Sequence, residues 1–195
     1  MWKTIRLGDI AKLYQPKTIS KKDMTDDGEY FVYGANGIIG RYHQFNHSTP
    51  QLIIGCRGSC GEVHLTRGKC WITGNAMVIQ PNEEVLKEYL RYFLLQPNIL
   101  RETITGTAQP QITRKSLSPV ELPIPPVPEQ KRIVDRLDRA FAEIDKAIAT
   151  AEAKEQEVER LKAAVLSAML SPETSDIGSI TEDKKPKETE YFVKK

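Results

Sequence analysis

The alternation of apolar and polar positions divides the chain into a strand-rich front, a long helical segment and a polar end. From the N-terminus to about residue 80, runs of four or five apolar and β-branched residues are separated by Gly, Asn and Asp. Such runs between turn formers predict the strands of a mixed or antiparallel sheet. The clearest runs are 30–33, 51–54 and 76–79. Before them, residues 2–13 predict a strand followed by a short helix that carries Leu7, Ile10 and Leu13.

A helix is predicted over residues 83 to about 103, where apolar side chains recur near helical spacing. Asn82 is placed to cap the start of this helix, and acidic residues follow in the first turn. Pro97 is expected to kink or split the helix. A polar loop, residues 106–113, then leads toward a proline-rich stretch.

The proline-rich stretch, residues 123–128, holds four prolines and predicts an extended, semi-rigid connector. From Glu129 onward the pattern is helical, with no Gly or Pro before Pro172. The apolar positions follow steps of four and three residues, interrupted at Lys154, and predict the heptad seam of a coiled coil. The seam consists of Ile133, Leu137, Ala140, Ile144, Ala147, Ala151, Val158, Leu161 and Val165.

Such a helix has a length near 60 Å, because about 42 residues each add ~1.5 Å. An apolar stripe on so long a rod is unstable when exposed to water, so we expect a partner helix. Small residues in the seam, Ala140, Ala147 and Ala151, favour close antiparallel pairing, although the pattern also allows a parallel dimer. The alternative, in which the helix folds back on its own domain, is less favoured. The rod exceeds the diameter of a globule of about 125 residues.

Composition and charge add further constraints. Hydrophobic residues make up 39% of the 195 residues, enough for one domain of ordinary size plus an appendage. The net charge is +4 over residues 1–128 and −1 over each of 129–170 and 171–195. This is a mild positive footprint at the front of the chain. Residues 171–195 are polar and charged, which predicts a disordered tail.

Three cysteines without a secretory signal before them predict free thiols in a reducing cytoplasm. No apolar run approaches the ~18 residues of a membrane span, so no membrane association is expected. Cys56, Cys60, His64 and Cys70 have spacings that structural zinc sites also show, but free cysteines in a β-core are the preferred interpretation. Neither a metal nor a cofactor is predicted.

Four short segments contain specific motifs. They are residues 2–10 (WKTIRLGDI), 53–61 (IIGCRGSCG), 106–113 (GTAQPQIT) and 122–134 (LPIPPVPEQKRIV). The run Pro-Pro-x-Pro-Glu-Gln-x-x-Ile in the last segment is the most specific. Together the segments resemble the target-recognition domain and the start of the spacer helix in type I restriction-modification specificity subunits. The likeness extends from residue 1 to about residue 170.

The resemblance implies an α+β fold, a globular mixed α/β target-recognition domain followed by a long coiled-coil-forming helix. We expect the domain at 1–122, the connector at 123–128 and the spacer helix at 129–170. Such subunits usually carry two recognition domains and two spacer helices, whereas this chain has one of each and resembles a half-subunit. It is then expected to pair through antiparallel helices with a second copy of itself or with a sister half-subunit.

By the same resemblance, the pair reads a bipartite site on double-stranded DNA. Such subunits also dock methyltransferase (modification) subunits and, through them, restriction subunits, and they perform no chemistry themselves. An alternative of a different class is a coiled-coil adaptor that binds only proteins. A third is a metal-dependent nuclease built on the acidic turn at 23–29, which a solvated loop also explains.

Basic and amide side chains in loops are the candidates for DNA contact. Arg57 lies among glycines, where the backbone can approach a phosphate, although a tight turn with one surface arginine explains it equally well. Gln109 suits adenine, and basic residues suit guanine or phosphate, whereas Gln111 and Ile112 are interpreted as structural. The predicted DNA-binding residues are Arg41, Arg57, Ser59, Arg67, Lys69, Thr107, Gln109, Arg114 and Lys115.

Catalytic motifs are missing from the sequence. It contains no phosphate-binding loop, no nucleophile elbow and no His-Glu-x-x-His helix. It also lacks the Asn/Asp-Pro-Pro-Tyr/Phe tetrapeptide expected of an amino-methyltransferase. A non-catalytic role is therefore predicted, with no catalytic residues assigned.

Overall fold

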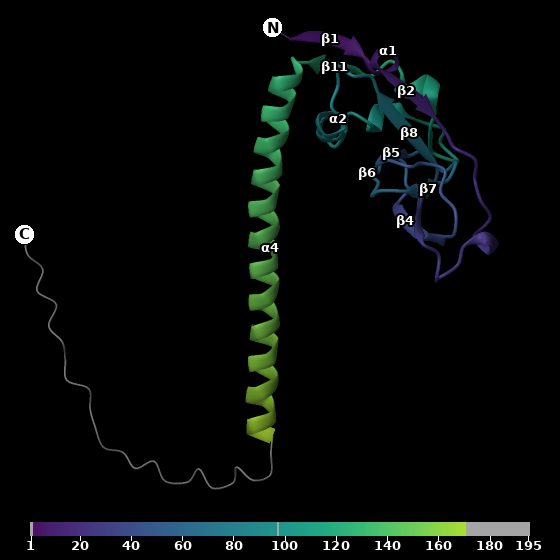
Figure 1. Cartoon of the computed structure of the whole chain (residues 1–195). Coiled ribbons are helices and arrows are strands. Elements are labelled where there is room, and N and C mark those ends of the chain that lie inside the picture. Colours follow the sequence, from purple (N-terminus) through teal and green to yellow (C-terminus); the bar gives the residue numbers. More distant parts are fainter. Residues whose placement is uncertain (1, 97, 171–195) are drawn as a thin grey trace, which may run out of the picture. The chain divides into compact units, whose positions relative to one another are not determined.

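The computed structural model describes residues 2–96 and 98–170, and they divide into two compact units. The first unit, Met1–Ala140, holds the strands, the short helices and the first turns of the long helix (Figure 1). The second unit, Phe141–Lys195, contains the rest of that helix. The tail predicted at 171–195 lies outside the described residues. A mixed α+β architecture that ends in a long helix is confirmed.

Strands of the first unit form two larger sheets and two short pairs. The four-stranded sheet is antiparallel throughout, in the order β2 (Ala11–Tyr14), β8 (Ala76–Pro81), β5 (Leu52–Gly55) and β6 (Val63–Leu65). The three-stranded sheet has the order β4 (Gly37–Tyr42), β3 (Tyr30–Gly34) and β7 (Cys70–Ile72), with β3 and β7 parallel. The antiparallel pairs are β1 (Lys3–Arg6) with β11 (Glu121–Ile124), and β9 (Ile104–Thr105) with β10 (Gln111–Ile112).

Helices are short except for the last one. They are α1 (Leu7–Ile10), η1 (Lys21–Asp23), α2 (Lys87–Leu94), η2 (Arg101–Thr103), α3 (Arg114–Leu117) and α4 (Val127–Leu170). Of these, η1 and η2 are single 3-10 turns. With 44 residues, α4 has a length of about 66 Å at ~1.5 Å per residue.

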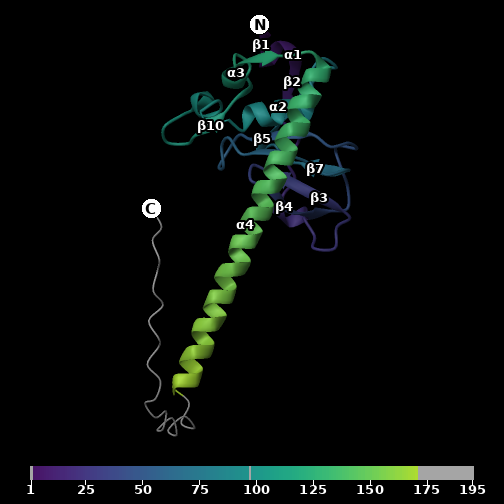
Figure 2. The same ribbon diagram turned by 90° about the vertical axis from the view of Figure 1, so that its left-hand side faces the viewer.

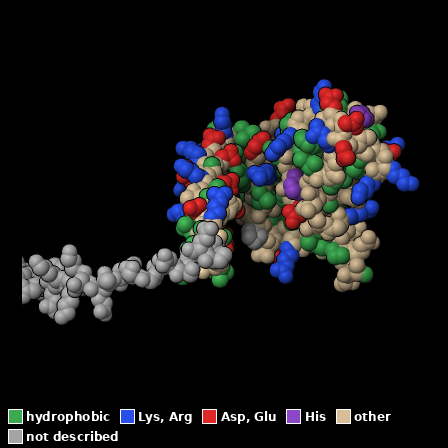
Figure 3. Space-filling view, turned by 90° about the horizontal axis from the view of Figure 1, so that it is seen from below, with side chains coloured by type: hydrophobic (Ala, Val, Ile, Leu, Met, Phe, Trp, Pro, Cys, Tyr) green, Lys and Arg blue, Asp and Glu red, His purple; other side chains and the backbone are tan. Residues whose placement is uncertain are grey.

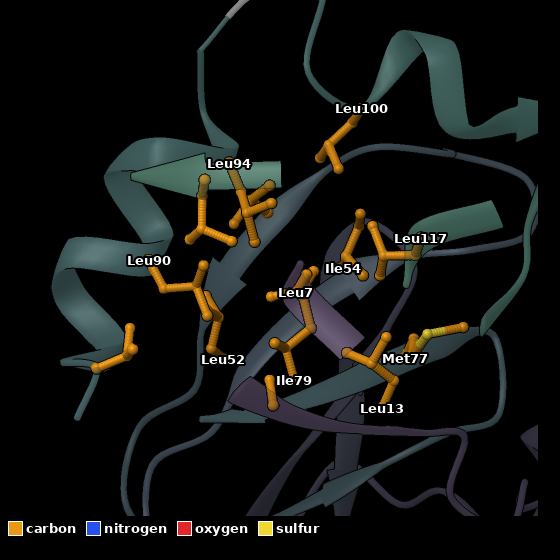
Figure 4. Packing of buried hydrophobic residues seen from close by; sticks show 14 of the residues in the cluster. Leu7, Leu13, Leu52, Ile54, Met77, Ile79, Leu90, Leu94, Leu100 and Leu117 are labelled. Carbon is orange, nitrogen blue, oxygen red and sulfur yellow. The ribbon is translucent and has the colours of Figure 1, made fainter. Parts of the chain in front are cut away.

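The core lies on both faces of β5. Leu52 and Ile54 point into the main cluster, where they meet side chains from α1, α2 and α3 (Figure 4). Ile53 points to the opposite face and packs in a second cluster with Ile72 and Val78. Side chains alternate between faces along a strand, so a strand buried on both sides reads as a continuous apolar run. The strands predicted at 51–54 and 76–79 are confirmed as β5 and β8, which both contribute side chains to the two clusters. The strand predicted at 30–33 is confirmed as β3.

At the N-terminus, a strand followed by a short helix is confirmed by β1 and α1, which buries Leu7 and Ile10. Leu13 was expected in that helix and lies instead in β2. Four residues are enough for the helix because both of its apolar side chains reach the main cluster, and β2 then pairs with β8.

The helix predicted over 83–103 is wrong in extent. The structure has an eight-residue α2, a turn and the separate η2 in this region. Asn82 does accept a hydrogen bond from the Glu84 amide at 3.1 Å, but this closes a turn before the helix. The amide of Leu86, the residue before α2, donates to the Gln130 side chain at 2.8 Å, so residues 83–86 are held in a non-helical segment. Pro97 lies outside the described residues.

The connector predicted at 123–128 is divided between two elements. Pro123 belongs to β11, where it faces Thr4 of β1 across a two-stranded pair that tolerates a missing amide. Helix α4 begins at Val127, two residues before the predicted start. Pro128 fits there because the first-turn amides of a helix have no intrahelical partner. The next amides, of Glu129 and Gln130, both donate to the Pro126 carbonyl, at 2.8 and 3.0 Å.

Candidate DNA interface and helix-pairing face

Two loops that are far apart in the sequence lie together on the first unit. Arg57 forms a β-bridge with Gln111, and the Ile112 amide donates to the Cys56 carbonyl at 3.0 Å. The Cys60 thiol donates to the Pro110 carbonyl at 3.1 Å. The loop at 56–61 and the loop at 105–113 therefore form one surface, which we call the paired loops.

Glycines shape the first of these loops. A Cβ on Gly55 would lie 2.1 Å from the Ser59 carbonyl oxygen, so only glycine allows the loop to fold this tightly onto the end of β5. Gly58 has φ +78°, and no atom lies within 4 Å of the position that its Cβ would take. The loop tip beside Arg57 is therefore open, as close approach of a backbone phosphate requires.

Six of the nine predicted contact residues lie on or beside the paired loops, and all six are exposed. They are Arg57, Ser59, Thr107, Gln109, Arg114 and Lys115. Thr113 caps α3, since its hydroxyl accepts from the Ser116 amide at 3.1 Å, and this fixes the two basic residues in the first turn. Ile112 is only 2% exposed, so its side chain belongs to the core. Figure 2 shows β10 and α3, the two elements joined by Thr113, near each other.

The remaining three predicted residues lie around the three-stranded sheet. Arg41 donates from Nε to the Gly28 carbonyl at 2.6 Å and stacks over Phe31, so its guanidinium holds the acidic turn in place. Lys69 lies over the ring of Phe45, 5.0 Å from its centroid. The Arg41 side chain thus stabilises the fold itself. Of the nine residues predicted to contact DNA, it is the one that the structure supports least.

Arg67 lines a cavity of about 400 Å³ together with Tyr33, Asn36, His64 and Arg91. In the described part of the chain, neither arginine forms an ion pair, and His64 Nε2 is buried without a hydrogen-bond partner. Neither Arg91 nor the position of His64 in a cavity was predicted from the sequence. A single arginine on a helix has no spacing that distinguishes it, and the cavity forms only when α2 packs beside β6.

On the face that Figure 3 shows, the cationic side chains of the globular unit do not gather into one patch. Lys and Arg are scattered there among acidic and uncharged side chains. This agrees with the mild positive excess in the first 128 residues. Contact with a polyanion would therefore depend on a few placed cations and on loop geometry rather than on a broad basic surface.

The zinc alternative has no support from the cysteine positions. Cys56 packs in the main core cluster and Cys70 in the second one. Burial raises the pKa of both thiols above the ordinary value of 9.0, so they are neutral near pH 7. Over residues 2–96 and 98–170, no group of three or more His, Cys, Asp or Glu side chains is placed to hold a metal ion.

The acidic turn also serves the local fold. The Asp23 carboxylate accepts a hydrogen bond from the Ser20 amide at 3.1 Å as part of a capping box around η1. Asp27 lies 3.7 Å from the His43 ring nitrogen, at an exposed site. These contacts favour the solvated-loop interpretation over the nuclease hypothesis.

The predicted seam of the long helix is divided between two environments. At its start, Ile133 packs partly against the main core cluster and Leu137 is half-buried. From Ala140 onward the seam is exposed, for example 51% at Ile144 and 56% at Leu161. The alternative in which the helix packs on its own domain thus holds for the first turns within the first unit.

The apolar face of the helix is wider than the predicted seam. Phe141 and Ile148 are 47% and 51% exposed, and they follow Val134 at intervals of seven residues. This row lies three or four residues from Leu137 and Ile144, so it borders the seam on the same face. The predicted seam includes only the positions that alternate in steps of four and three residues, so it leaves out this second row of apolar residues. Within the described residues, no helix has the length and apolar character to cross a bilayer.

The described residues form a mixed α+β domain that carries the paired loops, followed by a long helix with an exposed apolar face. This is the architecture that the sequence motifs predicted. The family model described as "Type I restriction modification DNA specificity domain" matches residues 1–160. The chain therefore belongs to this family, as the motifs predicted.

Individual relatives agree with this assignment. The specificity subunit of the type I restriction enzyme EcoDI from Escherichia coli is 26% identical over 174 residues, which are 88% of this chain and 38% of that protein. The MjaVIII specificity subunit from Methanocaldococcus jannaschii is 26% identical over an alignment of 200 positions, which covers 93% of this chain and 47% of that protein. The crystal structure of the S subunit from M. genitalium shares the fold, with a TM-score of 0.65 and 19% identity over 88% of this chain and 47% of that one. The chain thus spans less than half the length of these relatives.

Proposed function

We propose that this chain is the DNA sequence-specificity component of a cytoplasmic type I restriction-modification complex. Its recognition domain reads one half of a bipartite site on double-stranded DNA. Its long helix pairs antiparallel with the helix of a second copy or of a sister half-subunit. Methyltransferase subunits dock on this pair and bring restriction subunits with them, while the chain itself performs no chemistry. The observation that carries the proposal is the apolar face that is left exposed from Ala140 onward on a 44-residue helix, in a member of this family.

Reversal symmetry in the seam supports antiparallel pairing. In an antiparallel pair of two copies centred on position 149, Ile133 of one helix lies opposite Val165 of the other. Leu137 then lies opposite Leu161. In the middle, Ala147 meets Ala151, which allows two backbones to approach closely. The seam consists of two sets of heptad positions, which alternate along the helix. Each of these pairs combines one position from each set, as antiparallel coiled coils require. Only Ile144 meets a polar residue, Lys154, whose long stem can lie along an apolar surface.

The paired loops are proposed to contact DNA. Arg57, Arg114 and Lys115 are exposed, and no carboxylate in the described residues forms an ion pair with them. Free guanidinium and ammonium groups on open loop tips suit phosphate oxygens, while the Gln109 amide suits the edge of adenine. A rod of about 66 Å would hold two such domains one to two helical turns of DNA apart, at about 34–36 Å per turn.

A methylation map tests the proposal. The modification subunits are expressed with and without this chain, and methylated bases in the host DNA are located by sequencing. The expected result is a bipartite motif, interrupted by unread bases, that is present only with the chain. A symmetric motif would indicate two identical copies, and two different halves would indicate a sister half-subunit. Methylation that is independent of the chain would favour the adaptor alternative, and modified or cleaved DNA from the chain alone would favour the nuclease.

A further inference from the structure

One buried polar side chain connects the first turns of α4, which we call the root of the helix, to the recognition domain. Gln130, in the first turn of α4, is 0% exposed. Its Oε1 accepts a hydrogen bond from the Leu86 amide at 2.8 Å. Its Nε2 donates to the Glu84 carbonyl at 2.7 Å and to the Pro125 carbonyl at 2.8 Å. The amide group is therefore satisfied on both sides by backbone groups.

These bonds close the start of one helix with a side chain from another. Leu86 is the residue before α2, and no side chain of its own segment caps that helix. A glutamine normally serves this purpose from the third position of the same helix, by accepting from the amide that precedes it. Here Gln130 does so from α4, so the start of α2 and the start of α4 hold each other in place.

Other contacts at the root leave more freedom. Val134 and Ile133 pack on the main core cluster through apolar contacts, which are not directional. The hydroxyl of Tyr89 donates to the carbonyl of Pro123, which precedes the helix, and the hydroxyl of Tyr92 donates to the Asp138 carboxylate at an exposed site on α4. Gln130 forms three bonds in fixed directions from one planar group, so it restricts both tilt and rotation of the first turns.

We propose that Gln130 is the positioning residue that fixes the direction in which α4 leaves the recognition domain, and thereby the length of the unread DNA segment between two half-sites. This inference depends on the proposed function. A tilt of about 3° at the root of a rod of about 66 Å displaces its far end by about 3.4 Å, the rise of one base pair. If the hydrogen bonds of Gln130 are lost, the direction of the helix is less restricted. The complex should then distinguish less well between unread segments of different lengths.

The test uses the full chain and duplexes that carry both half-sites of the methylation motif. The unread segment is lengthened or shortened by one or two base pairs, and the affinity for each duplex is measured. We expect the unmodified chain to lose at least about tenfold in affinity per base pair of change, because the DNA must be twisted to compensate. Gln130→Met keeps the length of the side chain but none of its hydrogen bonds, and the loss should shrink to less than about threefold.

Two further variants keep the result interpretable. Lys131→Ala changes the exposed neighbour on the same turn and should retain the original selectivity. Gln130→Glu keeps the acceptor for Leu86 but removes both donated bonds, so it should also flatten the spacer profile if Gln130→Met does not fold. A uniform loss of affinity at every spacer length, with selectivity unchanged, would overturn the inference and show a merely structural role. Absence of a bipartite motif in the first place would instead overturn the proposed function.

Discussion

Replacing Leu161 by Asp tests whether the seam of the long helix is an interface. Leu161 is 56% exposed, and it would lie opposite Leu137 of the partner helix in the proposed antiparallel pair. Full burial of a leucine side chain stabilises by about 1.5–3 kcal/mol, so covering the exposed half contributes about 1 kcal/mol. A symmetric pair loses this twice, about 2 kcal/mol, which corresponds to about a 30-fold weaker dimer. Burial of a carboxylate beside Leu137 adds to the loss, so 30-fold is the minimum expected.

Sedimentation equilibrium of the purified chain measures the dissociation constant directly. Gln156→Asp introduces the same charge on the opposite side of the same helix and serves as the matched control, with an expected change of less than about threefold. Circular dichroism checks that both variants keep their helix. Equal dissociation constants for Leu161→Asp and Gln156→Asp would refute the assignment of the seam as an interface.

The remaining predictions concern the paired loops and the buried thiols. Substitution of Arg57 or Arg114 by Ala should lower the slope of log affinity against log salt by about 1 per removed phosphate contact, measured by fluorescence anisotropy on a duplex. An unchanged slope would remove that arginine from the interface. Because burial raises the pKa of Cys56 and Cys70 in the folded state, their contribution to stability is complete below the ordinary value of 9.0 and is lost as the pH rises through the folded-state pKa. The free energy of unfolding, from denaturant titrations between pH 7 and pH 10, should therefore fall above about pH 9, and less so in a Cys56→Ala variant. A flat profile in the unmodified chain would contradict this.

The local sequence pattern predicts an element correctly where that element depends little on distant residues. The run at 51–54 reads as a buried strand because β5 is covered on both faces, and no distant residue alters that pattern. Helix α4 was predictable as a long helix because no Gly or Pro interrupts the sequence from Glu129 to Leu170. The motif run through Pro128 and Gln130 identified the family, although its tertiary role could not be derived from spacing.

Long-range contacts account for what the sequence could not reveal. Residues 83–86 extend the helical spacing of the apolar residues that follow them. The Leu86 amide, however, donates a hydrogen bond to the side chain of Gln130, 44 positions later. The paired loops come together through the bond between Cys56 and Ile112, which no local pattern encodes. Arg41 resembles any surface arginine until Gly28 is seen beside it. In each case the deciding partner is remote in the sequence.

Disulfide trapping between two single-cysteine chains tests antiparallel pairing most directly. In a background without the native cysteines, Ala140→Cys and Val158→Cys introduce thiols at two exposed positions. These positions would face each other across the proposed antiparallel pair. We expect covalent dimers under mild oxidation only when the two variants are mixed. Covalent dimers from the Ala140→Cys chain alone would indicate parallel helices, and the absence of any dimer in the mixture would contradict the pairing on which the proposed reading of a bipartite site depends.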